Sequence, residues 1–183
     1  MRHLDGFSTP RLLAERLEPR HLGDLLTMDQ NALFMEKLGG VRGAAATEQY
    51  LERNLAHWAE HGFGLWVLRD MTSGAVIGRA VLRHLAVDGS DEIEVGYGFM
   101  PEYWGRGRAT EITLACLGIA REQLGLDSVV AITLPSNIAS QRVMQKAGLE
   151  YEREILHEGV PHVLFRTLLR PRGSGLPPTP RPA

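Results

Sequence analysis

The sequence predicts an α/β domain built on a mixed β-sheet. Strand and helix signals interleave from Arg11 to Thr167, which is the pattern of an α/β fold. Residues 92–99 alternate apolar side chains with acidic or glycine positions, which is the two-residue period of a strand. A strand–helix–strand unit from Glu92 to Thr133 should place two parallel strands around a right-handed crossover.

The first half of the chain is expected to hold two helices and three strands. Residues 11–17 alternate weakly, as a strand does, and Pro19 marks the start of a helix because its fixed φ suits the first turn. Thr47 is expected to cap a second helix, whose apolar residues recur at helical spacing. Residues 63–69 and 75–87 should form two strands joined by a glycine-containing turn.

The second half continues from the strand at 92–99. A long apolar helix is expected from about Gly107 to Leu124, followed by a buried strand at 128–133. Asn137 can cap the next helix, because its side chain is suited to accept from a free N–H group of the first turn. Residues 150–156 and 163–168 should close the domain as two strands around a turn.

Composition excludes several classes of protein. A chain of 183 residues and 20.3 kDa, with 44% hydrophobic and 23% charged residues, is neither disordered, fibrous nor a coiled-coil rod. Twenty Lys and Arg against 22 Asp and Glu give a net charge of −2, which offers no basic surface for nucleic acid. The single cysteine, Cys116, excludes an intrachain disulfide and a multi-cysteine zinc site.

The ends of the chain carry no membrane or export signal. No apolar stretch approaches the ~18 residues of a spanning helix, so we expect a soluble cytoplasmic protein without a membrane partner. Residues 170–183 hold five of the ten prolines and few apolar residues. We therefore expect a domain at 1–169 and a flexible Pro/Arg-rich tail at 170–183, with a proline-rich docking ligand as the alternative for the tail.

The most informative segment is a glycine-bearing loop that leads from a strand into a helix. Free N–H groups and the positive dipole end at a helix start can hold a phosphate, and Gly105 and Gly107 let the backbone approach it. Arg106 and Arg108 add positive charge. A dinucleotide-binding fingerprint would need a third glycine where Thr110 stands, and no Gly-Lys-Ser/Thr follows as a Walker A loop requires.

Residues 94–97 (EVGY) and 101–111 (PEYWGRGRATE) resemble the GNAT superfamily of N-acetyltransferases, specifically its RimJ/RimL-type branch of ribosomal-protein N-terminal acetyltransferases. The family's pyrophosphate loop, [Gln/Arg]-x-x-Gly-x-[Gly/Ala], falls on residues 104–109, with tryptophan in the first position. A second match lies at residues 137–149, and the resemblance extends over residues 11–166.

The resemblance implies the GNAT fold, a central mixed sheet with helices on both faces and two parallel strands that splay apart. Acetyl-CoA would bind as co-substrate in that cleft, with its pantetheine arm along the strand and its pyrophosphate on the loop. The implied cofactor-binding residues are Phe99, Met100, Trp104, Gly105, Arg106, Gly107, Arg108, Ala109, Thr110 and Asn137. The alternative is that Gly105 and Gly107 only make a tight turn.

The activity implied is direct transfer of an acetyl group to a primary amine, on a protein N-terminus or a small molecule. An amine with a pKa near ~10.4 must lose a proton before it attacks. Glu94, on the strand beside the thioester, is the expected base, and Glu92 shares its face. A solvated carboxylate without function is the alternative for Glu94. A backbone N–H near Phe99 or Met100 would meet the developing oxyanion.

The resemblance departs from the common family pattern at one position. Many members carry a tyrosine where this chain has Met144, which cannot donate a proton to the leaving thiolate. Ser140 is the expected donor, with Asn137 positioning it, unless Asn137 only caps its helix. The missing tyrosine keeps open a second reading, a non-catalytic acyl-CoA-binding or regulatory module.

No metal ion is expected. His57 and His61 lie four residues apart on a helix, but a surface pair or a lining of the acceptor cleft explains them better than a metal face. The resemblance also implies a homodimer, because members of the family pair through their C-terminal strands.

Overall fold

An eight-stranded mixed sheet organises residues 4–169, the part of the chain that this computed structural model describes. The spatial order of the strands is β1-β2-β3-β4-β5-β6-β8-β7. The strands are β1 (Gly6–Ser8), β2 (Leu12–Arg16), β3 (Leu65–Asp70), β4 (Val76–Val87), β5 (Ser90–Phe99), β6 (Ser128–Thr133), β7 (Glu150–His157) and β8 (Val160–Leu168). This confirms the predicted α/β class and mixed sheet. The expected tail at 170–183 lies outside the described residues.

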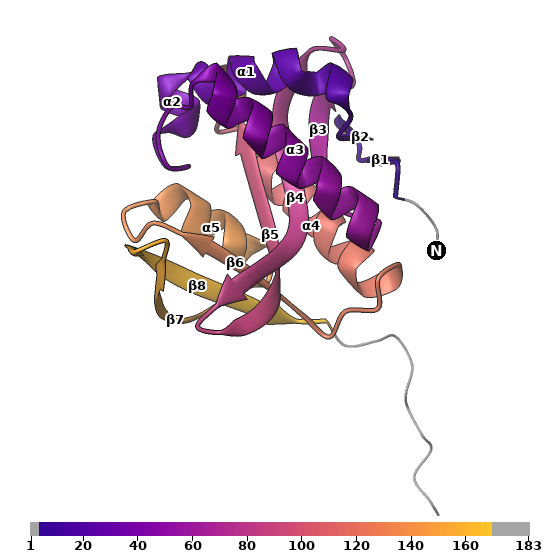
Figure 1. The fold of residues 1–183 in the computed structure, drawn as a ribbon. Coiled ribbons are helices and arrows are strands. Elements are labelled where there is room, and N and C mark those ends of the chain that lie inside the picture. The colour runs from indigo at the N-terminus through magenta and orange to yellow at the C-terminus, as the bar shows by residue number, and fades with distance from the viewer. Residues whose placement is uncertain (1–3, 170–183) are drawn as a thin grey trace, which may run out of the picture.

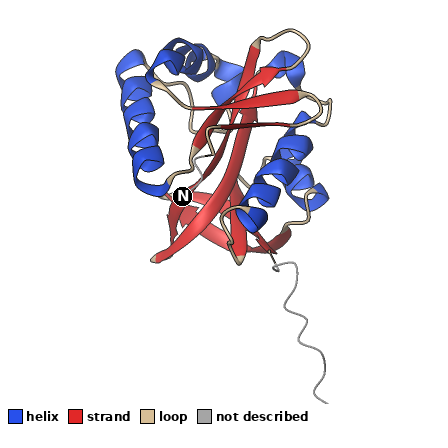
Figure 2. Cartoon of the chain, turned by 90° about the vertical axis from the view of Figure 1, so that its right-hand side faces the viewer, coloured by secondary structure: helices blue, strands red, loops and turns tan. Residues whose placement is uncertain are grey.

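Helices cover both faces of the sheet. They are α1 (Leu22–Gln30), α2 (Ala32–Met35), α3 (Ala44–His61), α4 (Arg108–Glu122) and α5 (Ile138–Lys146), with 3-10 turns η1 (Pro19–His21) and η2 (Pro101–Tyr103). The first three helices lie on one face, and α4 lies behind the sheet (Figure 1). Figure 2 shows the helices on either side of the strands. None of the helices between residues 4 and 169 has the length and apolar character needed to cross a bilayer.

A pair of tryptophans fixes α3 on the sheet. Trp58 and Trp66 are fully buried and meet edge to face, with ring centroids 5.4 Å apart. The Trp58 indole donates a hydrogen bond to the Leu65 carbonyl at 2.9 Å. A Cβ at Gly64 would come within 2.8 Å of the same indole, so the chain turns into β3 beneath the ring only with glycine there. The orientation of α3 across β3 and β4 follows from these contacts.

The predicted helix cap at Thr47 is wrong. Helix α3 begins after Gly43, and Thr47 lies fully buried in its first turn. The Thr47 hydroxyl donates to Asp29 Oδ2 on α1 at 3.1 Å, a buried partner that a local capping pattern cannot anticipate. Two elements, β1 and α2, were not predicted, because three or four residues are too few to show a period.

Two neighbouring strands separate at the point where the glycine loop begins. Among the described strands, only β5 and β6 run parallel, as predicted, and their ladder joins Glu94 to Val130 alone. At the end of β5, the Met100 N–H donates to the Ile77 carbonyl on β4 at 2.8 Å. Because hydrogen bonding alternates along a strand, the backbone groups of Phe99 face the opposite side, toward the gap that β6 leaves.

Candidate active site

The loop after β5 presents free N–H groups at the start of a long helix. Gly105 and Gly107 have φ values of +70° and +74°, which favour glycine. Helix α4 begins after Gly107, and Glu111 N donates to the Gly107 carbonyl at 3.1 Å. Within residues 4–169, no hydrogen bond from the N–H groups of residues 105–110 is present. This run, which includes Ala109 and Thr110 in the first turn, is suited to phosphate oxygens.

Trp104 ties the loop to the end of β5. Its indole Nε1 donates to the Phe99 carbonyl at 2.6 Å, while half of the side chain remains exposed. The Met100 N–H is bound to Ile77, and its carbonyl accepts from Tyr103 N at 2.9 Å. Of the two residues expected to pair with a pantetheine arm, Phe99 thus keeps its N–H directed to the gap, whereas the backbone of Met100 is bonded within the fold.

The two loop arginines differ in their surroundings. The Arg108 guanidinium donates to Asp70 Oδ2 at 2.6 Å and lies over the Tyr103 ring, 5.5 Å from its centroid. A hydrogen bond from Ser73 N–H, and then the one from Arg108, hold the pKa of Asp70 below its usual value. The sequence led us to expect the charge of Arg108 beside a polyphosphate, but Asp70 already neutralises it. Arg106 is exposed and is the basic side chain that the loop presents.

A residue that sequence reasoning missed, Arg11, braces the loop from the position just before β2. Its Nη1 donates to the Arg106 carbonyl at 2.7 Å, and its Nε donates to Glu111 Oε2 at 2.6 Å. Thr9 also donates to Glu111, at 2.6 Å. Burial acts to raise the pKa of Glu111, but the hydrogen bonds from Thr9 and Arg11 outweigh it and lower that pKa. No local pattern links residues so far apart in the chain.

Glu94 is buried on the sheet face that α3 covers. Its Oε2 accepts from Arg83 Nε at 2.6 Å, across a register pair of β4 and β5. This ion pair is the main cause of the raised pKa of Arg83, whose guanidinium stays charged. The other oxygen of Glu94, Oε1, has no hydrogen bond in the described part of the chain. It lies beside Gly96, 3.8 Å from the position that a Cβ on Gly96 would take. One oxygen is held and the other is available.

The neighbouring carboxylate on the same face is not available. Glu92 accepts from Arg166 through both oxygens, at 2.8 and 2.9 Å. These hydrogen bonds are the main cause of the lowered pKa of Glu92, which favours its ionised form. Glu94 therefore remains the better candidate for a base, as the sequence indicated.

Two glycines leave the sheet beside Glu94 without side chains. Gly96 and Gly98 face the same side as Glu94 and form a glycine strip on β5. A Cβ at Gly98 would come within 2.8 Å of Phe34 and 3.2 Å of Leu38, so α2 and the turn after it are seated on that end of the strip. Gly96 has only Val81 and Glu94 nearby. The strip thus leads from α2 to the free carboxylate oxygen.

The opposite face of β5 carries a hydroxyl pair. Asn137 Oδ1 accepts from Ser140 N at 3.2 Å, which confirms the predicted cap of α5, and its Nδ2 donates to Thr133 at 3.0 Å. The Ser140 hydroxyl lies 3.1 Å from the hydroxyl of Tyr97. Burial raises the pKa of Tyr97, which keeps the phenol protonated. Sequence reasoning missed Tyr97, although the two-residue period of the strand places it on the face opposite Glu94. Met144 is buried in the core.

The two histidines on α3 belong to an aromatic cluster rather than to an open surface. His57 and His61 have ring centroids 4.5 Å apart, and His84 of β4 lies 4.1 Å from His61. His57 Nδ1 lies 2.9 Å from the Phe63 carbonyl, and Nε2 accepts from His84 N–H at 3.1 Å. Both nitrogens of His57 are thus bound to backbone. In the described part of the chain, no group of three His, Cys, Asp or Glu residues could hold a metal ion.

A surface hollow of ≈ 480 Å³ lies elsewhere, between α4 and β8. Its walls are Leu114, Leu117, Gly118, Arg121, Ala147, Gly148, Thr167, Leu168 and Leu169. None of the loop, Glu94 or Ser140 contributes to it, so the hollow is not the site described above.

Comparison with known proteins assigns the family. Residues 11–150 match the model of the acetyltransferase (GNAT) domain, and the chain therefore belongs to the GNAT family of N-acetyltransferases. YkkB of Bacillus subtilis (strain 168) is 27% identical over 154 residues, covering 79% of this chain and 88% of that protein. The family match at residues 11–150 includes the glycine loop and both strands, β5 and β6, that border the gap.

Solved structures show the same fold. The acetyltransferase of Agrobacterium tumefaciens str. C58 superimposes with a TM-score of 0.78 at 22% identity, over 88% of this chain and 93% of that one. The spermidine N-acetyltransferase of Vibrio cholerae, solved in complex with CoA and spermine, has a TM-score of 0.72 at 16% identity, over 88% and 97%. The predicted GNAT fold is thereby confirmed.

Proposed function

We propose that this protein transfers an acetyl group from acetyl-CoA directly to a primary amine, as a member of the RimJ/RimL-type branch. The observation that carries the proposal is the placement of Glu94 and Tyr97 on opposite faces of β5, where β5 separates from β6. A base on one face and a hydroxyl pair on the other, beside free loop amides, are what direct transfer requires. We expect the activity to be cytoplasmic, on composition alone.

The co-substrate would be held by backbone groups. The N–H groups of residues 105–110 would bind the pyrophosphate, with Arg106 adding charge. The Phe99 N–H faces the gap and would meet the thioester carbonyl oxygen, where negative charge develops during attack. Trp104 occupies the Phe99 carbonyl and keeps the loop at the end of the strand. Met100 supports this geometry through its bonds to the fold.

The acceptor side would work through Glu94. Its Oε1 would take a proton from the acceptor ammonium, directly or through one water, while Arg83 holds Oε2 in place. The amine lone pair then forms a bond to the thioester carbon, and the bond from that carbon to sulfur breaks. The electron pair of the carbon–sulfur bond leaves on sulfur, and the acetyl group stays on nitrogen. The first proton passes from Glu94 to solvent, and the nitrogen, positively charged after the attack, loses its second proton to solvent and becomes the neutral amide.

The departing thiolate would receive its proton from Ser140. A thiol with a pKa near ~8.5 needs only a weak donor. Tyr97, 3.1 Å away, carries its proton because its pKa is raised, and it would return a proton to Ser140 and then be reprotonated by solvent. This pair would take over the role of the tyrosine that many family members carry at the position of Met144. Asn137 holds the first turn of α5 in position.

Thermal unfolding with acetyl-CoA, CoA, NAD(P)H or ATP tests the proposal. A ligand at ~100 times its Kd stabilises the folded state by about 2.7 kcal/mol. We expect stabilisation by acetyl-CoA and CoA alone, followed by thiol release when amines are added. No response to CoA, or a larger response to NAD(P)H, would overturn the proposal.

A second candidate is a non-catalytic acyl-CoA-binding module, favoured by the buried Met144 in place of a tyrosine. It predicts stabilisation by acetyl-CoA with no thiol release beyond hydrolysis for any amine. The Ser140–Tyr97 pair supports the enzyme over this candidate, because a module that only binds has no need of a proton donor at the gap.

A further inference from the structure

Three guanidinium groups border the acceptor side of the sheet. Arg79 and Arg83 stand on β4, opposite Gly98 and Glu94, and Arg42 lies in the segment between α2 and α3. Arg83 is paired with Glu94 at 2.6 Å. Arg79 is paired with the fully buried Asp29 at 2.7 Å and is itself buried. Each of the two β4 cations is therefore closely paired with a carboxylate.

Within residues 4–169, Arg42 has to share its carboxylate partner, Asp29, with Arg79. Its Nη1 lies 3.4 Å from both oxygens of Asp29, the limit of a hydrogen bond. Asp29 already accepts from Arg79 at 2.7 Å and from Thr47 at 3.1 Å. The Arg42 side chain is 28% exposed, against 7% for Arg79. Arg42 thus presents a guanidinium whose charge Asp29 cancels only in part.

One tyrosine ring contacts both Arg42 and Arg79. The Arg42 guanidinium lies 4.6 Å from the centroid of Tyr50, and Arg79 lies 4.9 Å from it. Arg79 stands opposite Gly98, at the far end of the glycine strip that leads to Glu94. The acceptor side therefore has the free carboxylate oxygen of Glu94 at one end of the glycine strip, and at the other end Arg79, Tyr50 and the partly neutralised guanidinium of Arg42.

We propose that the acceptor is a primary amine that also carries a carboxylate, an amino acid in chemical class. The amine meets Glu94 Oε1, and Arg42 binds the carboxylate through its planar, two-pronged guanidinium. A polyamine would bring a second ammonium against Arg42, where like charges repel. This inference rests on the proposed function, since it assigns the substrate of the same site.

Matched acceptors test the substrate class. Thiol release from acetyl-CoA is measured with amino acids of increasing separation between amine and carboxylate, each beside its carboxamide, and with spermidine. At the best separation, we expect kcat/KM at least tenfold higher for the acid than for its amide, and lowest for spermidine. Equal rates for acid and amide, or a preference for spermidine, overturn the inference.

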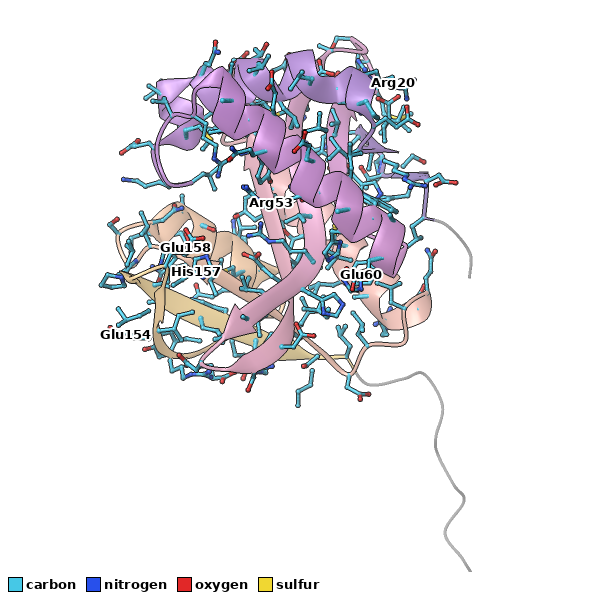
Figure 3. All side chains as sticks on the ribbon, viewed as in Figure 1. Arg20, Arg53, Glu60, Glu154, His157 and Glu158 are labelled. Carbon is cyan, nitrogen blue, oxygen red and sulfur yellow. The ribbon has the colours of Figure 1, made fainter. Side chains whose placement is uncertain are left out.

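Arg42→Gln assigns the effect to this residue. The variant should raise KM for the acid at least tenfold and leave KM for its amide and for acetyl-CoA unchanged, while Arg42→Lys should restore part of the loss. Arg53→Gln is the matched control, because Arg53 is an exposed arginine on α3, labelled in Figure 3. This variant should leave all three KM values unchanged. Equal losses for acid and amide would show a structural role and overturn the assignment.

The outcomes separate this inference from the proposed function. If thiol release is faster with amines that carry no carboxylate, the inference is overturned but the proposed acetyltransferase activity is supported. No stabilisation by acetyl-CoA and no thiol release with any amine sink both.

Discussion

The guanidinium of Arg83 and the carboxylate of Glu94 face each other across β4 and β5, with Nε 2.6 Å from Oε2. The pair fixes the carboxylate so that Oε1 turns toward Gly96, where no side chain stands. A strand carboxylate is thereby oriented by its neighbour on the next strand, and the orientation rather than the residue type alone makes it a candidate base.

Glu94→Gln should lower kcat about 10²- to 10⁴-fold at neutral pH, because the amide cannot take the proton of the ammonium. The Kd for acetyl-CoA, measured by calorimetry, should stay the same, since the loop amides are untouched. Glu92→Gln is the control: Glu92 lies on the same strand as Glu94, and the variant breaks its ion pair with Arg166 of β8 but should keep the rate. Equal losses of rate and co-substrate affinity would show that Glu94 has a different role.

Ser140→Ala should reduce kcat roughly tenfold below pH ~8.5 and less above it, because a thiolate leaves unaided once its conjugate acid is ionised in solution. Tyr97→Phe should have a smaller effect of the same kind. If the two hydroxyls act in series, the double variant is no slower than Ser140→Ala. Additive losses across the pH–rate profiles would show that they act separately.

Gly107→Ala should destabilise the fold by about 1–2 kcal/mol, because its φ of +74° strains any residue with a Cβ. Gly125→Ala, with a φ of +65° beyond the other end of α4, should cost about the same. Only the first should also weaken acetyl-CoA binding, since it disturbs the free N–H groups of the loop. Urea unfolding and calorimetry on both variants provide the comparison, and matched losses of affinity would refute the role of the loop.

His57 should make stability depend on pH. Burial is the main cause of its lowered pKa, so the folded state binds this proton less readily than the unfolded state. Between the ordinary value near ~6.5 and the lower folded value, the unfolded state holds more protons, and stability therefore falls as pH falls. His57→Gln should flatten the decrease in unfolding free energy from pH 7.5 to 5.5. His157→Gln, in the β7–β8 hairpin, should not; equal slopes in both variants would exclude His57 as the cause.

Features that depend on a few neighbouring residues could be predicted from the sequence. The glycine loop, the start of α4 and the Asn137 cap are local, because φ at Gly107 and the bond from Ser140 N involve residues within three positions. The same reasoning placed Glu94 and Glu92 on one strand face. It could not tell which carboxylate was free, since Arg166 lies in the last strand.

Contacts between distant segments were beyond local reasoning. Thr47 is a residue type that often caps helices, yet its hydroxyl donates a hydrogen bond to Asp29 on another helix. Arg108 lies in a phosphate-binding pattern, yet Asp70 at the end of β3 neutralises its charge. The Ser140–Tyr97 pair depends on how α5 settles against β5. Each case is a side chain whose partner is set by tertiary packing.

The spatial order of the strands has a consequence for how the molecule assembles. Strands β3, β4 and β5 follow one another through short turns, so that this meander can form from contacts close in sequence, whereas β2 must pair with β3 across the three helices α1, α2 and α3. The parallel pairing of β5 and β6 requires the whole α4 crossover to close first. The gap between these strands therefore takes shape after the meander of β3, β4 and β5, and slow or incomplete folding would leave the meander formed while the gap is still unfinished.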